Sequence, residues 1–173
     1  IFDKVDFGFF RYSVTQDWKM PHYEKMLDTN AGLLRNYSVA YNITKNEKYK
    51  KIAEETIGYI NKYLSDQENG GFYGSQDADE EFYLAKPEER KKKQYPYIDK
   101  TIYADWNSMM ISSYIKAGAV LNDKKITEFA IKTADFMWSA IILMALVSSL
   151  FFLYFFFESV SIRVIIGKNA SVR

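Results

Sequence analysis

Apolar residues recur at helical spacing in the first part of the chain and predict a pair of helices. The first helix is expected within residues 23–41 and the second within 52–64, because apolar side chains return every three or four residues in both segments. The link at 43–46 is so short that the two helices must run antiparallel. Asn69-Gly70-Gly71 then ends the helical pattern.

A second helical hairpin of similar size is expected within residues 106–121 and 126–137, with Asn122-Asp123-Lys124 as its link. Each hairpin follows a loop in which a glycine precedes two aromatic residues. These loops are Gly8-Phe9-Phe10 and Gly71-Phe72-Tyr73. We therefore predict an all-α fold of tandem helical hairpins that stack side by side, with the loops gathered on one rim.

The amphipathic pattern stops at about Ser139, where the sequence becomes almost wholly apolar. The run Ala140–Phe157 contains no charged residue, and about 18 helical residues are enough to cross most of a lipid bilayer. Three interpretations remain open: a membrane anchor, a buried core helix, or sequence that is not native to the domain, as a frame slip would produce. We predict a helical domain at 1–138 and an atypical apolar tail at 139–173, either membrane-like or non-native.

Composition narrows the possible chemistry. The formal net charge is +1, which does not favour a nucleic-acid partner. The sequence has no cysteine and one histidine, so disulfides, thiolate nucleophiles, cysteine-ligated metals and multi-histidine metal sites are excluded for these residues. We predict no metal ion and no cofactor. Aromatic residues make up 17% of the chain, which suits a sugar-binding cleft and equally a dense core.

The single histidine, His22, follows Pro21, and proline fits the first position of a helix. A helix that begins there would place His22 and Glu24 in its first turn, where the dipole favours a neutral imidazole and an ionised carboxylate. His22 could then act as a proton-transfer base beside Glu24. The alternative is that both are polar residues of a helix start without catalytic role. Asn30, in the same stripe, is expected either to line a polar cavity beside His22 or to bind a neighbouring loop.

Two further groups of residues are candidates for a site. Asp77 and Asp79 alternate with Ala78, so in an extended segment their carboxylates share one face, as an acid and a base would. The alternative is a solvated acidic loop. Asp105 is expected to cap the third helix. Trp106 and Asn107 follow it, and an indole and an amide at a rim are typical of sugar contacts, although a core tryptophan is common too.

Several of these stretches, taken in order, resemble the spermatogenesis-associated, thioredoxin-domain-containing protein family. The matching stretches are Gly8–Ser13, Asp17-Trp18, Pro21–Leu27, Gly70–Tyr73, Gln76–Asp79, Asp99-Lys100 and Asp105–Asn107. The resemblance covers residues 1 to about 138, and the sequences PHYEKML and QDADEE are its most specific parts.

This resemblance implies an (α/α)6 toroid of the six-hairpin glycosidase-like type, similar to N-acylglucosamine 2-epimerase. It also implies an N-terminal thioredoxin-like domain, which is missing from this sequence, and a cytoplasmic location. The chain departs from the family pattern in its apolar tail, which would imply a membrane location if it is genuine.

The resemblance suggests a fragment of a sugar-active barrel with epimerase- or glycosidase-like acid/base chemistry on a carbohydrate. His22, Glu24, Asp77 and Asp79 are the candidate catalytic residues. The candidate substrate-binding residues are Tyr12, Trp18, Asn30, Asp105, Trp106 and Asn107. Two other functions remain open: a non-catalytic binding or scaffold module for the thioredoxin-like domain, and a membrane-anchored helical protein.

Overall fold

A computed structural model describes the backbone of residues 1–169 and the side chains of residues 1–151. The predicted apolar tail is therefore covered in part, because the side chains of residues 152–173 and the backbone of 170–173 lie outside this description. The chain divides into two compact units, Ile1–Phe136 and Met137–Arg173. This boundary falls two residues before the predicted one.

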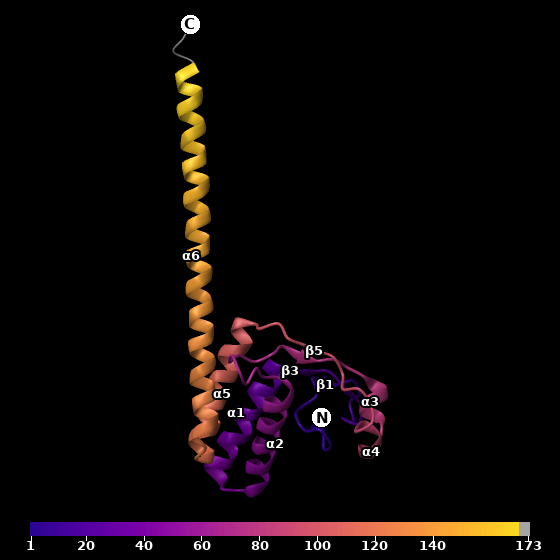
Figure 1. Cartoon of the computed structure of the whole chain (residues 1–173). Helices are drawn as coiled ribbons and strands as arrows, with labels where there is room; N and C mark the ends of the chain where they lie inside the picture. Colours follow the sequence, from indigo (N-terminus) through magenta and orange to yellow (C-terminus); the bar gives the residue numbers. More distant parts are fainter. Residues whose placement is uncertain (170–173) are drawn as a thin grey trace. The chain divides into compact units, whose positions relative to one another are not determined.

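The first predicted hairpin is formed by α1 (Leu27–Thr44) and α2 (Glu47–Tyr63), which pack against each other (Figure 1). The turn between them is tight. Lys45 adopts the left-handed conformation at φ 56°, and the side chain of Asn46 accepts a hydrogen bond from the backbone N–H of Lys48 at 3.0 Å. This left-handed residue ends α1 and the asparagine cap begins α2.

The second hairpin repeats this construction. Its helices are α5 (Ala104–Leu121) and α6 (Lys124–Asn169), of which only the part up to Phe136 belongs to the first unit. Asn122 is left-handed at φ 57°, and the carboxylate of Asp123 accepts the backbone N–H of Lys125 at 2.9 Å. Both predicted hairpins are therefore confirmed, and the observed links, residues 45–46 and 122–123, lie within the predicted ones.

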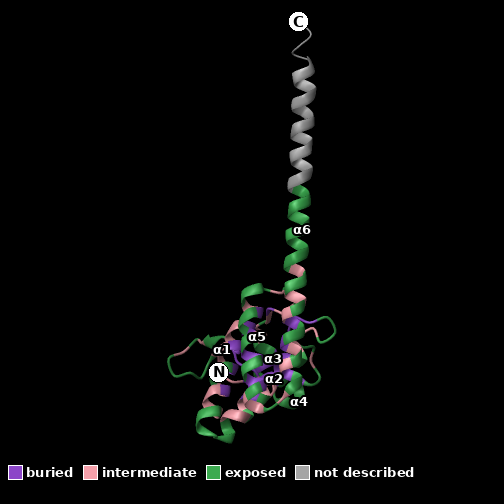
Figure 2. Ribbon diagram, turned by 90° about the vertical axis from the view of Figure 1, so that its left-hand side faces the viewer, coloured by how far each residue is buried: buried purple, intermediate pink, exposed green. Residues whose placement is uncertain are grey.

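The core lies where α1, α2 and α5 meet the first turns of α6, and the buried residues gather there (Figure 2). Its main buried apolar side chains are Leu27, Ala31, Leu34, Ala53, Ile57, Ile60, Leu64, Phe72, Met110, Tyr114, Ala117, Ile126 and Ala130. They recur every three or four residues along each helix, so one face of each helix is removed from water.

Within the described residues, three short strands precede the first hairpin, and two short strands and two short helices lie between the hairpins; the sequence pattern does not predict them. Strand β1 (Tyr12–Ser13) pairs with β2 (Pro21–His22). A separate sheet has the order β3-β4-β5, and its strands are Lys25–Met26, Ser75–Gln76 and Ile98–Asp99. The helices α3 (Glu80–Leu84) and α4 (Pro87–Arg90) follow β4. All strands have two residues, so the architecture remains that of stacked helical hairpins.

A buried amide fixes the first glycine-aromatic loop to the start of α1. The side chain of Asn30 accepts the backbone N–H of Phe9 at 2.8 Å and donates to the carbonyls of Phe9 at 3.0 Å and Met26 at 2.8 Å. Gly8 lets the same loop pass close to α2, since its φ is +73° and an added Cβ would lie 2.4 Å from the ring of Tyr59.

The second glycine-aromatic loop is fixed to α5 in the same way. Asn107 accepts the backbone N–H of Phe72 at 2.8 Å and donates to the carbonyls of Phe72 and Tyr103, both at 2.9 Å. Gly71 has φ +104°, and an added Cβ would lie 2.9 Å from Ile102. The repeat expected from the two loops is thus present in atomic detail, and it includes an asparagine at the fourth position of each following helix.

The second unit begins inside α6. From Ile141 to Phe151 its large apolar side chains are exposed. Among the described residues, α6 is the one helix, over Lys124–Phe151, whose length and apolar composition would suffice to cross a membrane.

Removing either asparagine amide should destabilise the fold strongly. We expect Asn30→Ala and Asn107→Ala each to lower the free energy of unfolding by about 3 kcal/mol, because each leaves buried backbone groups of a loop without a partner. Urea denaturation followed by circular dichroism measures this. The exposed Asn42, in α1, provides the control, and Asn42→Ala should change the free energy by less than about 0.5 kcal/mol. Equal effects of all three substitutions would contradict the structural role of the two amides.

Candidate functional site

His22 lies on a small hairpin and stacks on Tyr12. The two residues are opposite each other in the β1–β2 register, and their rings are 5.0 Å apart with an interplanar angle of 19°. The Nδ1 atom of His22 is buried and has no hydrogen-bond partner among the described residues. A buried polar atom of this kind is normally satisfied by water or a ligand.

The predicted helix start at Pro21 is wrong. Pro21 and His22 form β2, and α1 begins at Leu27. Proline tolerates the end of a short edge strand as well as a helix start, and the backbone pairing with β1 decides between them here. His22 and Glu24 therefore do not lie in a first helical turn, and the argument from the helix dipole does not apply to them.

Glu24 is held by Arg11, a residue that the sequence did not single out. The Arg11 guanidinium lies 3.0 Å from a carboxylate oxygen of Glu24, and the Arg11 backbone N–H donates to the Glu24 carbonyl at 2.8 Å. Tyr12 is the next residue along the chain and lies beside His22. The structure therefore brings Arg11, Tyr12, His22 and Glu24 together, and we call these four residues the hairpin cluster.

The loop between β1 and β2 presents Trp18 to solvent. Its side chain is 66% exposed, and its backbone is left-handed at φ 60°, an unusual conformation for a bulky residue. Thr15 and Asp17 brace the loop through a side-chain hydrogen bond of 2.7 Å. The Trp18 side chain is therefore accessible to a ligand, and its role in substrate binding stays a prediction.

Asp77 and Asp79 line one open cavity of about 480 Å³ at the end of β4. We call it the carboxylate pocket, and its lining is Asp77, Ala78, Asp79, Glu80, Gln94, Tyr95, Pro96 and Tyr97. The Asp79 carboxylate also caps α3, because it accepts the backbone N–H of Phe82 at 2.8 Å. Tyr97 is 73% exposed beside these carboxylates, and no motif in the sequence pointed to it.

The strand register relates the hairpin cluster to the carboxylate pocket. Lys25 of β3 lies opposite Gln76 of β4, so Glu24 and Asp77 are the next residues along these two strands. Asp77 continues the ladder on its other side, since its backbone N–H donates to the Tyr97 carbonyl at 2.8 Å. Glu24 of the hairpin cluster and Asp77 of the carboxylate pocket therefore lie at the same end of this three-stranded sheet.

The start of α5 differs from the prediction. The capping residue is Tyr103, and Asp105 is an exposed residue of the first turn. Trp106 is half-buried, packs against the core, and lies 4.6 Å from the ring of Tyr103. The hydroxyl of Tyr103 donates to Asp99 at 3.1 Å, which ties this helix start to β5.

Asn30 and Asn107 are fully buried, and their amide groups are bonded to backbone atoms of the two loops. The sequence left open whether Asn30 lines a cavity or binds a loop, and it binds a loop. A direct sugar contact by Asn107, expected from its position at a helix start, finds no exposed atom in this geometry. We therefore assign both amides to the fold.

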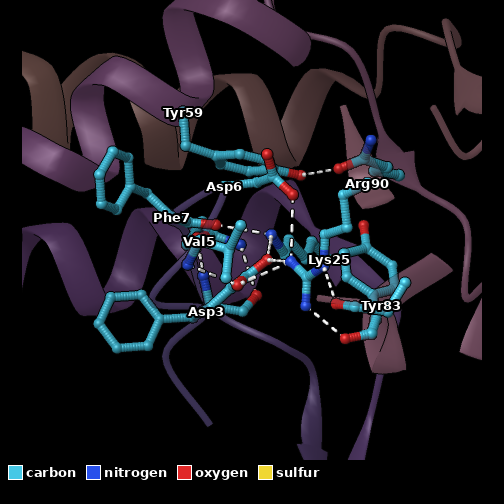
Figure 3. Close-up of polar contacts among 12 residues, drawn as sticks. Asp3, Val5, Asp6, Phe7, Lys25, Tyr59, Tyr83 and Arg90 are labelled. Atoms are coloured by element: carbon cyan, nitrogen blue, oxygen red, sulfur yellow. Dashed lines mark hydrogen bonds and ion pairs between the residues drawn. The ribbon is translucent and has the colours of Figure 1, made fainter. Parts of the chain in front are cut away.

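A buried group of charges surrounds Lys25, the residue after Glu24, and sequence reasoning missed it (Figure 3). Lys25 has no exposed surface. Its ammonium donates to Asp3 at 2.8 Å and to the carbonyl of Phe7 at 2.6 Å. The same ammonium lies 4.6–5.0 Å from three aromatic ring centres, those of Phe10, Tyr59 and Tyr83.

Arg90 completes this ion cluster from α4. Its guanidinium lies 3.1 Å from the carboxylates of both Asp3 and Asp6, and it also donates to the backbone carbonyls of Tyr83 and Ala85. The ion cluster of Asp3, Asp6, Lys25 and Arg90 contains two cations and two anions, so its charges balance. It joins three segments that are far apart in the sequence.

Burial lowers the pKa of Lys25 to about 8, although the ion pair with Asp3 acts in the opposite direction. Burial also disfavours the charged form of Asp3, but Lys25 and Arg90 outweigh it and hold the pKa of Asp3 below its usual value. Both groups of the pair are therefore charged at neutral pH. With every polar atom of Lys25 engaged and no exposed surface, the ion cluster is a structural element rather than an open site.

Among the described residues, no group of three or more histidine or acidic side chains is arranged to hold a metal ion.

No family model matches the sequence. The chain is 42% identical over 77 residues to human spermatogenesis-associated protein 20, which confirms the predicted resemblance; the match covers 44% of this chain and 10% of the human protein. It is 32% identical over 93 residues to a cellobiose 2-epimerase of Bacteroides fragilis, covering 54% of this chain and 22% of the epimerase. The matched parts are thus about a tenth to a fifth of these relatives' lengths.

Solved structures share the fold. A sugar epimerase from a ruminal bacterium has a TM-score of 0.61 at 18% identity, over 78% of this chain and 31% of the epimerase. A family 76 glycoside hydrolase from a bovine Bacteroides thetaiotaomicron strain has a TM-score of 0.55 at 16% identity, over 69% of this chain and 23% of the hydrolase. The predicted fold class, a fragment of an (α/α)6 toroid, is confirmed.

The lowered pKa of Lys25 predicts an unusual dependence of stability on pH. Between about pH 8 and the ordinary lysine pKa of about 10.4, the unfolded chain holds a proton that the folded protein has lost. The contribution of Lys25 to the free energy of unfolding should therefore rise with pH across this window. We expect the difference in this free energy between the wild type and Lys25→Met to increase by a few kcal/mol between pH 7 and pH 10. Chemical denaturation at several pH values measures it, and a constant or falling difference would contradict the assignment.

Proposed function

Because the chain is a fragment of the six-hairpin glycosidase-like fold, we propose that its first unit binds a carbohydrate at the sheet edge formed by the hairpin cluster and the carboxylate pocket. The observation that carries this proposal is the register of β3, β4 and β5, which puts Glu24, Asp77 and Tyr97 on neighbouring strand ends. Three separate parts of the sequence thereby supply a carboxylate or an exposed ring to one edge.

The size and lining of the carboxylate pocket support a sugar ligand. Its volume of about 480 Å³ lies in the range of about 300–1,000 Å³ that is usual for small-molecule sites. Carboxylates and the amide of Gln94 can accept and donate hydrogen bonds to hydroxyl groups, while the exposed ring of Tyr97 offers a flat apolar face. The relatives named as a cellobiose 2-epimerase and a sugar epimerase favour the same class of ligand.

Acid/base chemistry is the finer part of the proposal. His22 is the proposed proton-transfer base, because its Nδ1 has no partner within the described protein. Asp77 or Asp79 is the proposed acid, since both face the carboxylate pocket. Arg11 orients Glu24 beside His22. Either an epimerase-like or a glycosidase-like reaction would use these groups within a complete toroid.

A second candidate is a non-catalytic binding or scaffold module, attached to a thioredoxin-like domain as in the resembling family. The cap that Asp79 provides to α3 favours it, because that carboxylate already serves the fold. A cytoplasmic location would follow from the resemblance, whereas the apolar part of α6 favours attachment to a membrane.

Sugar binding is tested with the full 173-residue chain in detergent micelles, using cellobiose as the probe and saturation-transfer NMR as the measurement. Tyr97→Ala should weaken binding about tenfold or more, because stacking on the ring is lost, whereas Tyr97→Phe should retain it. Asp77→Asn should also weaken binding. Glu68→Gln is the matched control at an exposed carboxylate that does not line the carboxylate pocket. Unchanged binding in Tyr97→Ala would remove this pocket from the proposal.

Turnover is tested on the same chain by following formation of the C2 epimer of cellobiose. If His22 transfers the proton, His22→Ala should lower kcat by at least about 100-fold while the urea midpoint is nearly unchanged. Tyr12→Phe keeps the ring against His22 and should leave kcat within a few-fold. Binding of cellobiose without turnover in the wild type would favour the binding module for this chain.

A further inference from the structure

We infer that residues 137–157 of α6 cross a lipid bilayer. This inference concerns attachment and does not depend on the proposed ligand. No charged residue occurs between Asp135 and Glu158. The segment Met137–Phe157 lies within a continuous helix and would be about 31 Å long, which matches the roughly 30 Å thickness of the hydrocarbon layer.

The exposed surface of this helix is apolar on all sides. Its large exposed side chains in the described part are Ile141, Ile142, Leu143, Met144, Leu146, Val147, Leu150 and Phe151. At about 100° per residue these eight side chains leave no gap wider than about 100° around the helix axis. A helix that is apolar all round needs an apolar surrounding on every side.

A neighbouring protein helix explains this surface less well than a bilayer does. A partner helix or a further hairpin of the toroid needs one apolar stripe and leaves the opposite face to water. The first turns of α6 have such a stripe, since Ile126, Ala130 and Thr133 are buried at intervals of three and four residues. The stripe is not continued in the second unit. A lipid environment is the one that covers a whole helix circumference with apolar groups.

Two other sources of long apolar helices do not apply here. The core helix of a water-soluble domain is mostly buried. In α6, none of the most apolar stretch of 18 residues within Lys124–Phe151 is buried in the described structure. A signal sequence lies near an N-terminus, whereas this segment follows a folded unit of 136 residues.

Details of the helix agree with a bilayer. Trp138 is 65% exposed at the start of the segment, where tryptophan is favoured at the boundary between lipid and water. The hydroxyl of Ser149 donates to the carbonyl of Ala145 at 2.8 Å, so this polar group is satisfied within the helix. Lys132 and Asp135 precede the segment and Glu158 and Arg163 follow it, so charges occur on both sides and not within it.

The inference is tested by flotation of the full chain, synthesised in the presence of vesicles of phosphatidylcholine and phosphatidylglycerol. We expect the wild type to float with the vesicles in a sucrose gradient and to stay with them after an alkaline carbonate wash. Leu146→Arg with Leu150→Arg should abolish flotation, because each arginine near the bilayer centre lowers insertion on the order of 100-fold. Ile43→Arg with Ile131→Arg, two exposed apolar residues of the first unit, is the matched control and should float.

Three results would overturn the inference. The wild type could pellet without floating, which indicates aggregation. It could remain in the aqueous fraction as a soluble assembly, which indicates a protein partner such as a second copy. It could float but be released by carbonate, which indicates attachment to the surface only. Cellobiose binding by the Leu146→Arg, Leu150→Arg variant is a separate readout, so failure of the anchor and failure of the sugar site are distinguishable.

Discussion

One buried amide in each helical hairpin binds the loop that precedes the hairpin, and the position of both glycine-aromatic loops depends on these bonds. An asparagine side chain matches a peptide group because it offers one acceptor and two donors, and Asn30 and Asn107 use all three. The loop backbone must come into contact with the helix for these bonds to form. Glycine stands before the bonded aromatic residue in both loops, where φ is positive and a Cβ would collide with Tyr59 of α2 or with Ile102 before α5.

Strand β3 connects this framework to the candidate site. Successive side chains of a strand point to opposite faces, so Lys25 enters the ion cluster while its neighbour Glu24 pairs with Arg11 on the more exposed side. A buried ion pair adds little net stability, because the loss of hydration offsets most of the attraction. The ion pairs instead specify which segments pack together. Asp3 and Arg90 find their partners when the N-terminal segment and α4 pack next to Lys25, and Lys25 directly follows Glu24 of the hairpin cluster.

The helical hairpins could be predicted because their apolar stripes have a period near 3.6 residues and the links between them are short. The strands could not, since two residues are too few to establish an alternating pattern. Pro21 illustrates the difficulty, because proline is tolerated at the first residue of a helix and of an edge strand, and the deciding pairing is with Ser13, eight residues away. Periodicity alone predicts stacked hairpins. The toroid could be predicted only from the stretches that resemble a known family.

The candidate site was predictable in its carboxylates and less so in its surroundings. Asp77 and Asp79 stand out as an acidic pair, but Tyr97 carries no local signal and reaches them only through the β4–β5 pairing. A sequence pattern would predict an exposed side chain for a lysine such as Lys25. Its burial depends on Asp3 and Arg90, which are 22 and 65 positions away. Residues whose environment is built by such distant contacts are the ones that sequence reasoning misses.

The pattern of apolar residues in α6 differs between the two units. Up to Thr133 its buried positions return every three or four residues, as packing against a protein core requires. From Ile141 to Phe151 eight of the eleven residues are large, apolar and exposed, and they are spread around the helix, so no face is reserved for water. A toroid made of hairpins would need the first pattern to continue. Because the proposed sugar recognition depends on loops of the first unit and the proposed membrane attachment on the second pattern, a substitution that alters one of these properties has no physical reason to alter the other.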